Sequence, residues 1–482
     1  MVRRREARLC TCSRHLIGLV LAVAAYPAAA QTGPLINQNL YFTRAAGAQQ
    51  GHYLEADGGF VFTDNVTRTP NGTSDTLALL GLVGDIARTG TRLDYSLVSD
   101  IFFVDYLHSS FQSQPFGFLN ASAEAWITPG FFSWTARETF AQTLLDPLAP
   151  VTPENLESFN YLSTGPRFTL RPTLRTTIIV DGTYSYLTSS SKSPAYVNID
   201  NHRYAGTFTL KQAFTNTSSG YVTAGGQRVE FSDQVINTNF TQRELLAGYK
   251  LSDARTELDL VGGYSWLHVG TETPSGSIWR FLLVRQISPA QRISLRASQV
   301  VTDAPNLFRL SLDQPVISTI PYSFTTSQPF TERQLGGDWQ LQGSRTALQL
   351  GFLSIRDRYE LTPSSDRDLK IGSAFLTRQI SPTLKFVIGG EFLRQQYTTG
   401  GSFDTVYATT YLRWQLGRRL ALRFLYGYSN QTPKTPNGYT ENQVGVIASY
   451  AFVPGGQVSG EPGTEPASPL ETLPESTPPS AQ

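Results

Sequence analysis

Four histidines follow residue 30, and they are the side chains best suited to acid–base chemistry near neutral pH. They are His52, His108, His202 and His268. Asp105 lies near His108 in the sequence and Asp200 near His202, so a hydrolase site at one rim of the fold is conceivable. No nucleophile motif of the form G-x-S-x-G accompanies them. We therefore expect no catalytic residues and no enzyme activity.

Metal and cofactor sites have still less support. Both cysteines, Cys10 and Cys12, fall within the first 30 residues, and the chain has no H-x-x-x-H and no EF-hand loop. No glycine-rich phosphate loop opens a predicted helix. The formal net charge of +1 creates no field that would attract nucleic acid. The sequence therefore predicts no cofactor, no metal and no nucleic-acid partner.

Alternating segments dominate the rest of the chain. In residues 420–428, Leu and aromatic side chains occupy the even positions, whereas Ala421, Arg423, Leu425 and Gly427 occupy the odd ones. A period of two places these sets on opposite faces of a strand. The segments run to about 12 residues, against about 5–6 in a typical soluble sheet, and about 10 suffice to cross a bilayer at a tilt. Tyr and Trp stand near their ends, as interfacial residues do.

Tight turns and longer loops join these segments in alternation. Ser381-Pro382-Thr383 is a representative turn, because Pro presets φ and cannot continue a central strand. Short turns at one end and long loops at the other are typical of bacterial outer-membrane barrels. We therefore predict an all-β fold, a transmembrane antiparallel up-and-down β-barrel of about 20 strands, with 18 to 22 possible. A secreted soluble all-β domain is the alternative.

Charged residues within the segments are costly on the lipid face, so we expect them to point inward. The candidates for the lumen lining are Arg92, Asp94, Arg175, Asp181, Glu244, Asp259, Arg296, Glu391, Arg413 and Arg423. They either pair with one another and fill the interior of a wide barrel, or line a water-filled channel. Mixed charge together with Tyr, Gln, Thr and Ser suits a hydrated neutral or weakly charged glycan better than a purely ionic solute.

The chain divides into four parts by composition. Residues 1–30 have a basic start, a short apolar run and Ala28-Ala29-Ala30, as in a signal peptide cleaved near Ala30. Residues 31–50 would be a periplasmic lead-in, and 51–452 the barrel. Residues 453–482, rich in Pro, Ser and Glu, would be a disordered periplasmic tail. We thus expect a protein of the Gram-negative outer membrane, in contact with its lipid and lipopolysaccharide.

The longest expected outer loops are 303–330, 144–158 and 188–202. Long loops in a compact fold tend to be functional, so 303–330 is a candidate constriction or lid, with a simple surface cap as the alternative. After the first strand, Asn71-Gly72 suits a turn with φ > 0, and Asp64, Asn65 and Asp75 can cap backbone groups of the loop.

A family resemblance rests on the first strand and the loop after it. Residues 58–66 read GGFVFTDNV, followed by Thr69-Pro-Asn-Gly72 and Ser74-Asp75. This resembles the β-barrel porin family associated with exopolysaccharide and PEP-CTERM/exosortase loci, and the RQIS-Pro hairpins look like that family's repeats over residues 52–452. The resemblance implies a pore for exopolysaccharide export that acts with a periplasmic polysaccharide-export protein. The alternatives are a plugged structural or surface barrel and a general diffusion porin.

Overall fold

The computed structural model describes residues 52–145, 152–191, 198–234, 237–303, 328–359, 361–398, 401–433 and 438–452. The expected signal peptide, the lead-in, the tail and most of loop 303–330 lie outside these ranges. Among the described residues, no helix has the length and apolar character to cross a membrane.

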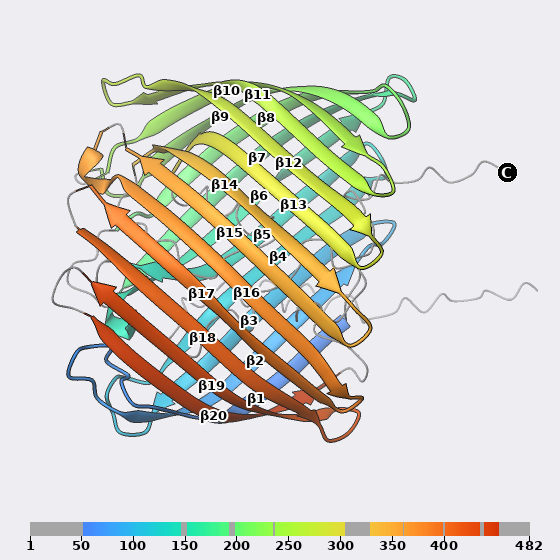
Figure 1. Cartoon of the computed structure of the whole chain (residues 1–482). Helices are drawn as coiled ribbons and strands as arrows, with labels where there is room; N and C mark the ends of the chain where they lie inside the picture. The colour runs from blue at the N-terminus through green and yellow to red at the C-terminus, as the bar shows by residue number, and fades with distance from the viewer. Residues whose placement is uncertain are drawn as a thin grey trace, which may run out of the picture.

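Twenty antiparallel strands and two 3-10 turns make up this part of the chain (Figure 1). The strands are β1 (His52–Thr63), β2 (Asp75–Arg88), β3 (Leu93–Tyr106), β4 (Gln114–Thr128), β5 (Phe132–Leu144), β6 (Leu156–Leu170), β7 (Thr176–Ser191), β8 (Asn201–Ala213), β9 (Ser218–Phe231), β10 (Phe240–Ser252), β11 (Thr256–Val269), β12 (Ser275–Ser288), β13 (Gln291–Thr302), β14 (Phe330–Gln342), β15 (Thr346–Arg358), β16 (Arg367–Ser381), β17 (Leu384–Tyr397), β18 (Gly401–Gln415), β19 (Leu420–Pro433) and β20 (Tyr439–Ala451). The 3-10 turns are η2 (Pro153–Asn155) and η3 (Pro363–Ser365).

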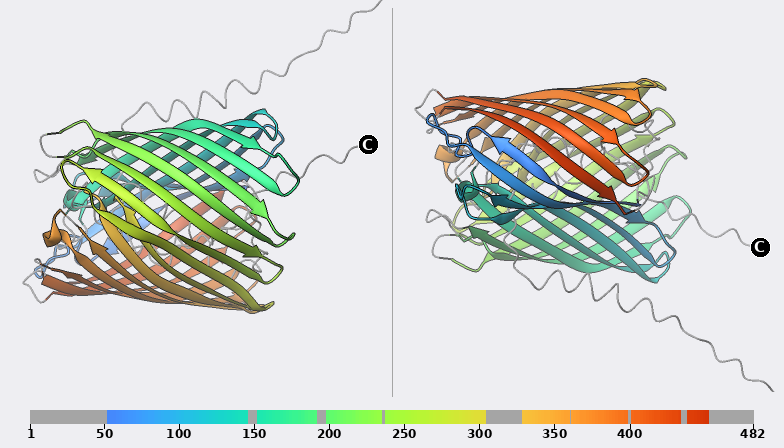
Figure 2. Two further views of the ribbon diagram at one scale, coloured as in Figure 1. Left: turned by 90° about the horizontal axis from the view of Figure 1, so that it is seen from above. Right: turned by 90° about the horizontal axis from the view of Figure 1, so that it is seen from below.

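Each strand pairs with its neighbours in the sequence, and β1 pairs with β20. The sheet is therefore closed, and it leaves no unpaired edge. Figure 2 shows the tilted strands continuing round both sides. The predicted transmembrane antiparallel up-and-down barrel is confirmed, with 20 strands.

The two ends of the barrel have different connections. Nine connections of two to five residues lie at the right-hand end in Figure 1, and the other end carries connections of up to 27 residues. We call these the short-turn end and the long-loop end. β1 begins and β20 ends at the short-turn end, as an even strand count requires. Two of the three expected outer loops, 144–158 and 188–202, are shorter than predicted, because β6 already starts at Leu156 and β7 continues to Ser191.

The repeated RQIS segment has a structural explanation. A β-bulge lies between Gln286 and Ser288, and the same irregularity lies between Gln379 and Ser381. In each repeat the Gln amide donates to the carbonyl oxygen of the Ser that follows the bulge, at 2.7 and 2.6 Å respectively. The bulge disrupts the pairing locally and increases the twist, so the segment turns the chain back just before Pro289 and Pro382.

The outer surface of the barrel is apolar along the middle of the strands. Leu80, Phe352 and Phe424 are among the large apolar side chains that are more than 40% exposed. Trp and Tyr side chains, such as Trp266 and Trp414, are also exposed on this surface. A closed cylinder with an apolar exterior is the arrangement that a bilayer requires, because the strands satisfy each other's backbone groups within the wall.

Candidate functional site: the barrel interior

Among the inward side chains of β7–β13, a set of polar residues remains accessible, which we call the polar wall. The same strands also carry two buried apolar clusters, one that includes Leu246 and one that includes Val269. The members of the polar wall are half-exposed or exposed: Asp181, Thr183, Thr207, Thr209, Thr223, Gln227, Glu244, Asp259, Arg280, Arg296 and Ser298. They alternate with outward apolar residues such as Val180, Phe208 and Val222. The strand period of two therefore separates the lipid-facing and the water-facing sets.

Hydrogen bonds between side chains position the polar wall and leave some of its donors and acceptors accessible. Arg167 on β6 donates through Nε to Asp181 at 2.6 Å, and Thr207 donates to the second oxygen of Asp181 at 3.3 Å. The hydroxyls of Thr209 and Thr223 lie 2.9 Å apart. Because these side chains remain partly exposed, the wall offers donors, acceptors and both signs of charge to a solute.

The opposite part of the interior is packed. The inward side chains of β1–β4 and β17–β20 contribute to one buried apolar cluster that includes Val61, Phe102 and Ile447. Beside the cluster, the Glu55 carboxylate lies 3.0 Å from the Arg413 guanidinium and 3.9 Å from that of Arg423. The interior thus has an accessible polar side and a filled side, which the sequence pattern did not distinguish.

The ten predicted lumen residues fall into three groups. Asp181, Glu244, Asp259 and Arg296 lie on the polar wall. Asp94, Glu391, Arg413 and Arg423 also point inward; Asp94 accepts a hydrogen bond from Trp126 near the short-turn rim, and the other three lie on the packed side. Arg92 and Arg175 lie at the short-turn end, because β3 begins at Leu93 and β7 at Thr176, one residue after each arginine. Both are exposed residues of short turns.

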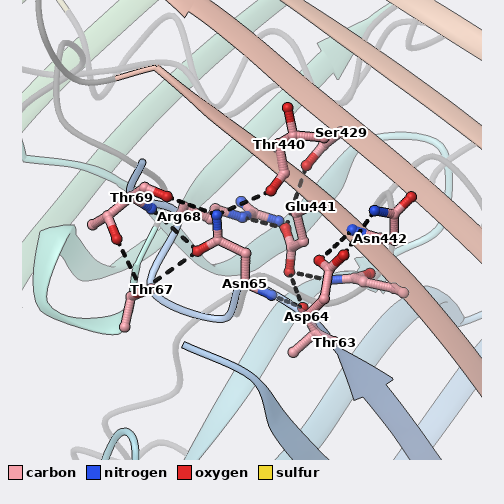
Figure 3. Close-up of polar contacts among 11 residues, drawn as sticks. Thr63, Asp64, Asn65, Thr67, Arg68, Thr69, Ser429, Thr440, Glu441 and Asn442 are labelled. Atoms are coloured by element: carbon pink, nitrogen blue, oxygen red, sulfur yellow. Dashed lines mark hydrogen bonds and ion pairs between the residues drawn. The ribbon is translucent and has the colours of Figure 1, made fainter. Parts of the chain in front are cut away.

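Thr63, Asp64 and Asn65, which we call the TDN motif, lie where the barrel closes, next to β20 (Figure 3). The backbone N–H of Asn442 donates to the Asp64 carboxylate at 2.7 Å, and the Asn442 amide donates to its other oxygen at 2.7 Å. Asn65 donates to the carbonyl oxygens of Thr69 and Thr440, at 2.8 and 3.0 Å. The motif joins the first strand, its loop and the last strand.

A buried ion pair reinforces this closure. Arg68 donates through Nε to Glu441 at 2.7 Å, and the two side chains are 7% and 1% exposed. Thr63 and Gln443 each donate to the other Glu441 oxygen at 2.7 Å. Burial alone would lower the pKa of the Arg68 guanidinium, but the Glu441 carboxylate outweighs this effect, so the pKa is raised.

The loop after β1 differs from the sequence prediction in its backbone. Arg68 adopts φ 52°, whereas Asn71 and Gly72 do not have positive φ. The left-handed residue is thus the one whose side chain reaches Glu441, and tertiary contacts rather than local preference select it. Asn65 caps the loop as predicted, because it accepts the backbone N–H of Thr69 at 3.2 Å. Asp64 and Asp75 instead accept backbone N–H groups of other segments, those of Asn442 and His108, at 2.7 and 2.9 Å.

Contacts cross the interior at the long-loop end. Arg203 on β8 and Asp303, directly after β13, form a bidentate ion pair with Nη1–Oδ1 at 3.1 Å, although four strands, β9–β12, lie between β8 and β13. Phe330 at the start of β14 and Tyr359 after β15 belong to one buried cluster with Tyr161 of β6. We call these contacts the mouth bridge. They draw β13–β15 toward β6–β8.

The histidines do not form a catalytic arrangement. His108 Nδ1 lies 2.9 Å from Asp75 rather than meeting Asp105, and His202 Nδ1 lies 2.9 Å from the Tyr184 hydroxyl rather than meeting Asp200. Asp200 instead accepts the backbone N–H of Ser189. In the described part of the chain, no group of three or more His, Cys, Asp or Glu side chains could hold a metal ion.

Comparison with known proteins gives similarity of fold only. No protein-family model matches the chain, and no curated protein matches it. Among solved structures, the siderophore receptor PirA from Pseudomonas aeruginosa is 8% identical with a TM-score of 0.43, covering 83% of this chain and 81% of its own. The FrpB iron transporter from Neisseria meningitidis (F3-3 variant) is 8% identical with a TM-score of 0.41, covering 86% and 83%. A mutant of the ferric enterobactin receptor PfeA from Pseudomonas aeruginosa is 9% identical with a TM-score of 0.45, covering 85% and 81%.

Proposed function

We propose that this chain is a pore of the Gram-negative outer membrane that exports an exopolysaccharide. The observation that carries the proposal is the polar wall, which follows seven neighbouring strands, β7–β13, with accessible Thr, Gln, Ser and paired charges. Hydroxyl, amide and carboxylate groups can exchange hydrogen bonds with a hydrated sugar chain as it passes. The resemblance of the TDN segment to barrels of exopolysaccharide loci supports the same substrate.

The barrel has room for such a path. Barrels of about 16–18 strands already leave an aqueous channel, and this one has 20. The packed side and the mouth bridge restrict the open part of the interior to the region next to the polar wall. A passive pore provides no direction, so net export would depend on a periplasmic polysaccharide-export protein at the short-turn end.

A second candidate is a plugged structural barrel, and the mouth bridge favours it. Contacts between β8 and the end of β13, together with the buried cluster around Phe330, span the long-loop end. If these contacts close the path, the protein conducts nothing. A general diffusion porin is the third candidate, and it predicts unimpaired polysaccharide secretion in a deletion strain.

Conductance of single barrels in planar bilayers tests the proposal. We expect a defined open level, reduced by the double variant Thr207→Trp/Thr223→Trp, because the two indoles fill the polar wall. Ala224→Trp is the matched control, since Ala224 follows Thr223 in β9 but faces lipid. It should conduct like the parent protein.

Two results would count against export. No conductance from the folded parent barrel or from Asp303→Asn, which removes the ion pair of the mouth bridge, would favour the plugged barrel. Equal conductance of the double-tryptophan variant and the parent would show that the polar wall is not the path.

A further inference from the structure

The nine short turns carry a strong excess of positive charge. They contain seven arginines and a single carboxylate, Asp253. All seven are exposed, and we call them the turn arginines: Arg92, Arg171, Arg175, Arg255, Arg345, Arg418 and Arg419. A chain with a net charge of only +1 thus has one positive end once the barrel brings these turns together.

The turn arginines occur in alternate turns. They lie in the turns β2–β3, β6–β7, β10–β11, β14–β15 and β18–β19, and the four turns between these contain no Lys or Arg. Successive arginine turns are thus four strands apart, which corresponds to about 25 Å along the rim for tilted strands. The positive charge therefore surrounds the whole rim instead of forming a patch on one side.

Exposed aliphatic side chains accompany the turn arginines. Leu93 follows Arg92 and is 44% exposed, and Leu174 precedes Arg175 and is fully exposed. Leu416 and Leu420 flank the last arginine pair and are also exposed. Arginine beside exposed leucine is the composition of surfaces that insert into the headgroup region of an anionic bilayer.

The arginines at the two ends of the barrel differ in the contacts that the described residues show. At the long-loop end, Arg367, Arg356 and Arg394 pair with Asp357, Asp368 and Asp404. At the short-turn end, by contrast, Arg419 donates to the neutral hydroxyl of Tyr450 at 3.1 Å.

Asp253 is already engaged within its own turn. It accepts the backbone N–H groups of Arg255 and Thr256 at 2.8 and 2.7 Å. The backbone N–H of Arg255 is the largest contribution to the lowered pKa of this carboxyl. Its charge thus compensates backbone dipoles inside the turn.

We propose that the short-turn rim binds the phosphate headgroups of anionic phospholipids, with the turn arginines as ligands and the neighbouring leucines inserted among the acyl chains. The ring of ligands would retain several lipids around the barrel and fix its depth in one leaflet. A lipid surface fits better than a soluble polyanion, because a soluble partner would leave the leucines in water.

Native mass spectrometry of the folded barrel, released from detergent with phosphatidylglycerol or phosphatidylcholine, tests this proposal. We expect several phosphatidylglycerol molecules to be retained and few phosphatidylcholine molecules. Arg92→Gln/Arg175→Gln/Arg345→Gln/Arg418→Gln should lower phosphatidylglycerol affinity about tenfold or more, given the contribution of each basic residue near an anionic surface.

The control variant removes the same charge from the opposite end. Arg228→Gln/Arg333→Gln/Arg356→Gln/Arg394→Gln changes four exposed arginines near the long-loop end and should leave phosphatidylglycerol retention unchanged. Heat-modifiable migration on gels confirms that both variants are folded. Equal retention of the two lipids, or equal losses in the two variants, would overturn the proposal. Loss of binding to a soluble polyuronate with unchanged lipid retention would instead assign the ring to an acidic polymer.

Discussion

At the scale of single residues, Glu441 is the most heavily engaged carboxylate of the closure. It accepts from Thr63, Arg68, Gln443 and, at 3.3 Å, from Ser429. None of these contacts provides a reacting group, so the conspicuous TDN segment has a structural role in this barrel. This motif thus lies at the seam where β1 and β20 close the barrel, and not at a catalytic site.

We expect Glu441→Ala to lower the free energy of unfolding by about 3–5 kcal/mol, because it leaves the Arg68 guanidinium buried without its counterion. Urea unfolding in detergent, followed by tryptophan fluorescence, measures the change. The loss should be largely recovered in Arg68→Met/Glu441→Leu, where no buried charge remains.

The control for this prediction is an exposed pair of similar geometry. Arg394 and Asp404 form two hydrogen bonds of 2.7 Å, but Arg394 is 55% exposed. Asp404→Ala should cost less than about 1 kcal/mol, as exposed pairs do. Equal losses from the two substitutions would refute the assigned role of burial.

At the scale of elements, the approach of β1 to β20 depends on a glycine. An added Cβ on Gly59 would lie 2.2 Å from the Val446 carbonyl oxygen and 2.8 Å from the Ile447 Cα. The adjacent Gly58 has open space, since its nearest atom would be 3.8 Å away. The two glycines of the first strand are therefore not equivalent, although they are neighbours in the sequence.

Gly59→Ala should destabilise the barrel by about 1–3 kcal/mol through overpacking at the seam, whereas Gly58→Ala should be nearly neutral. The midpoint temperature of heat-modifiable migration on gels compares the two. A barrel in which Gly58→Ala is the more harmful change would be inconsistent with this register of β1 and β20.

At the scale of the whole molecule, the exterior and interior must face different solvents. Leu80 on β2 is 67% exposed and lies among outward apolar residues, whereas Thr223 on β9 lies on the polar wall. The same substitution at these two positions therefore distinguishes a membrane barrel from a soluble one.

Leu80→Arg should cost about 2–4 kcal/mol when the barrel folds into a bilayer, whereas Thr223→Arg should cost little, because only the first places a charge in lipid. Urea titrations of the barrel folded into vesicles measure both. Similar small costs at the two positions would argue against a lipid-facing exterior.

The sequence by itself determined the strands, their approximate number and which face of each is apolar, because a period of two and the turn residues act over a few positions. It also determined that Asp181, Glu244, Asp259 and Arg296 point inward. Only the tertiary structure decided that these four lie on an accessible side while Glu391, Arg413 and Arg423 lie on a packed one. Alternation is a local property, whereas packing, the mouth bridge and the ring of turn arginines arise when residues far apart in the chain meet as the barrel closes.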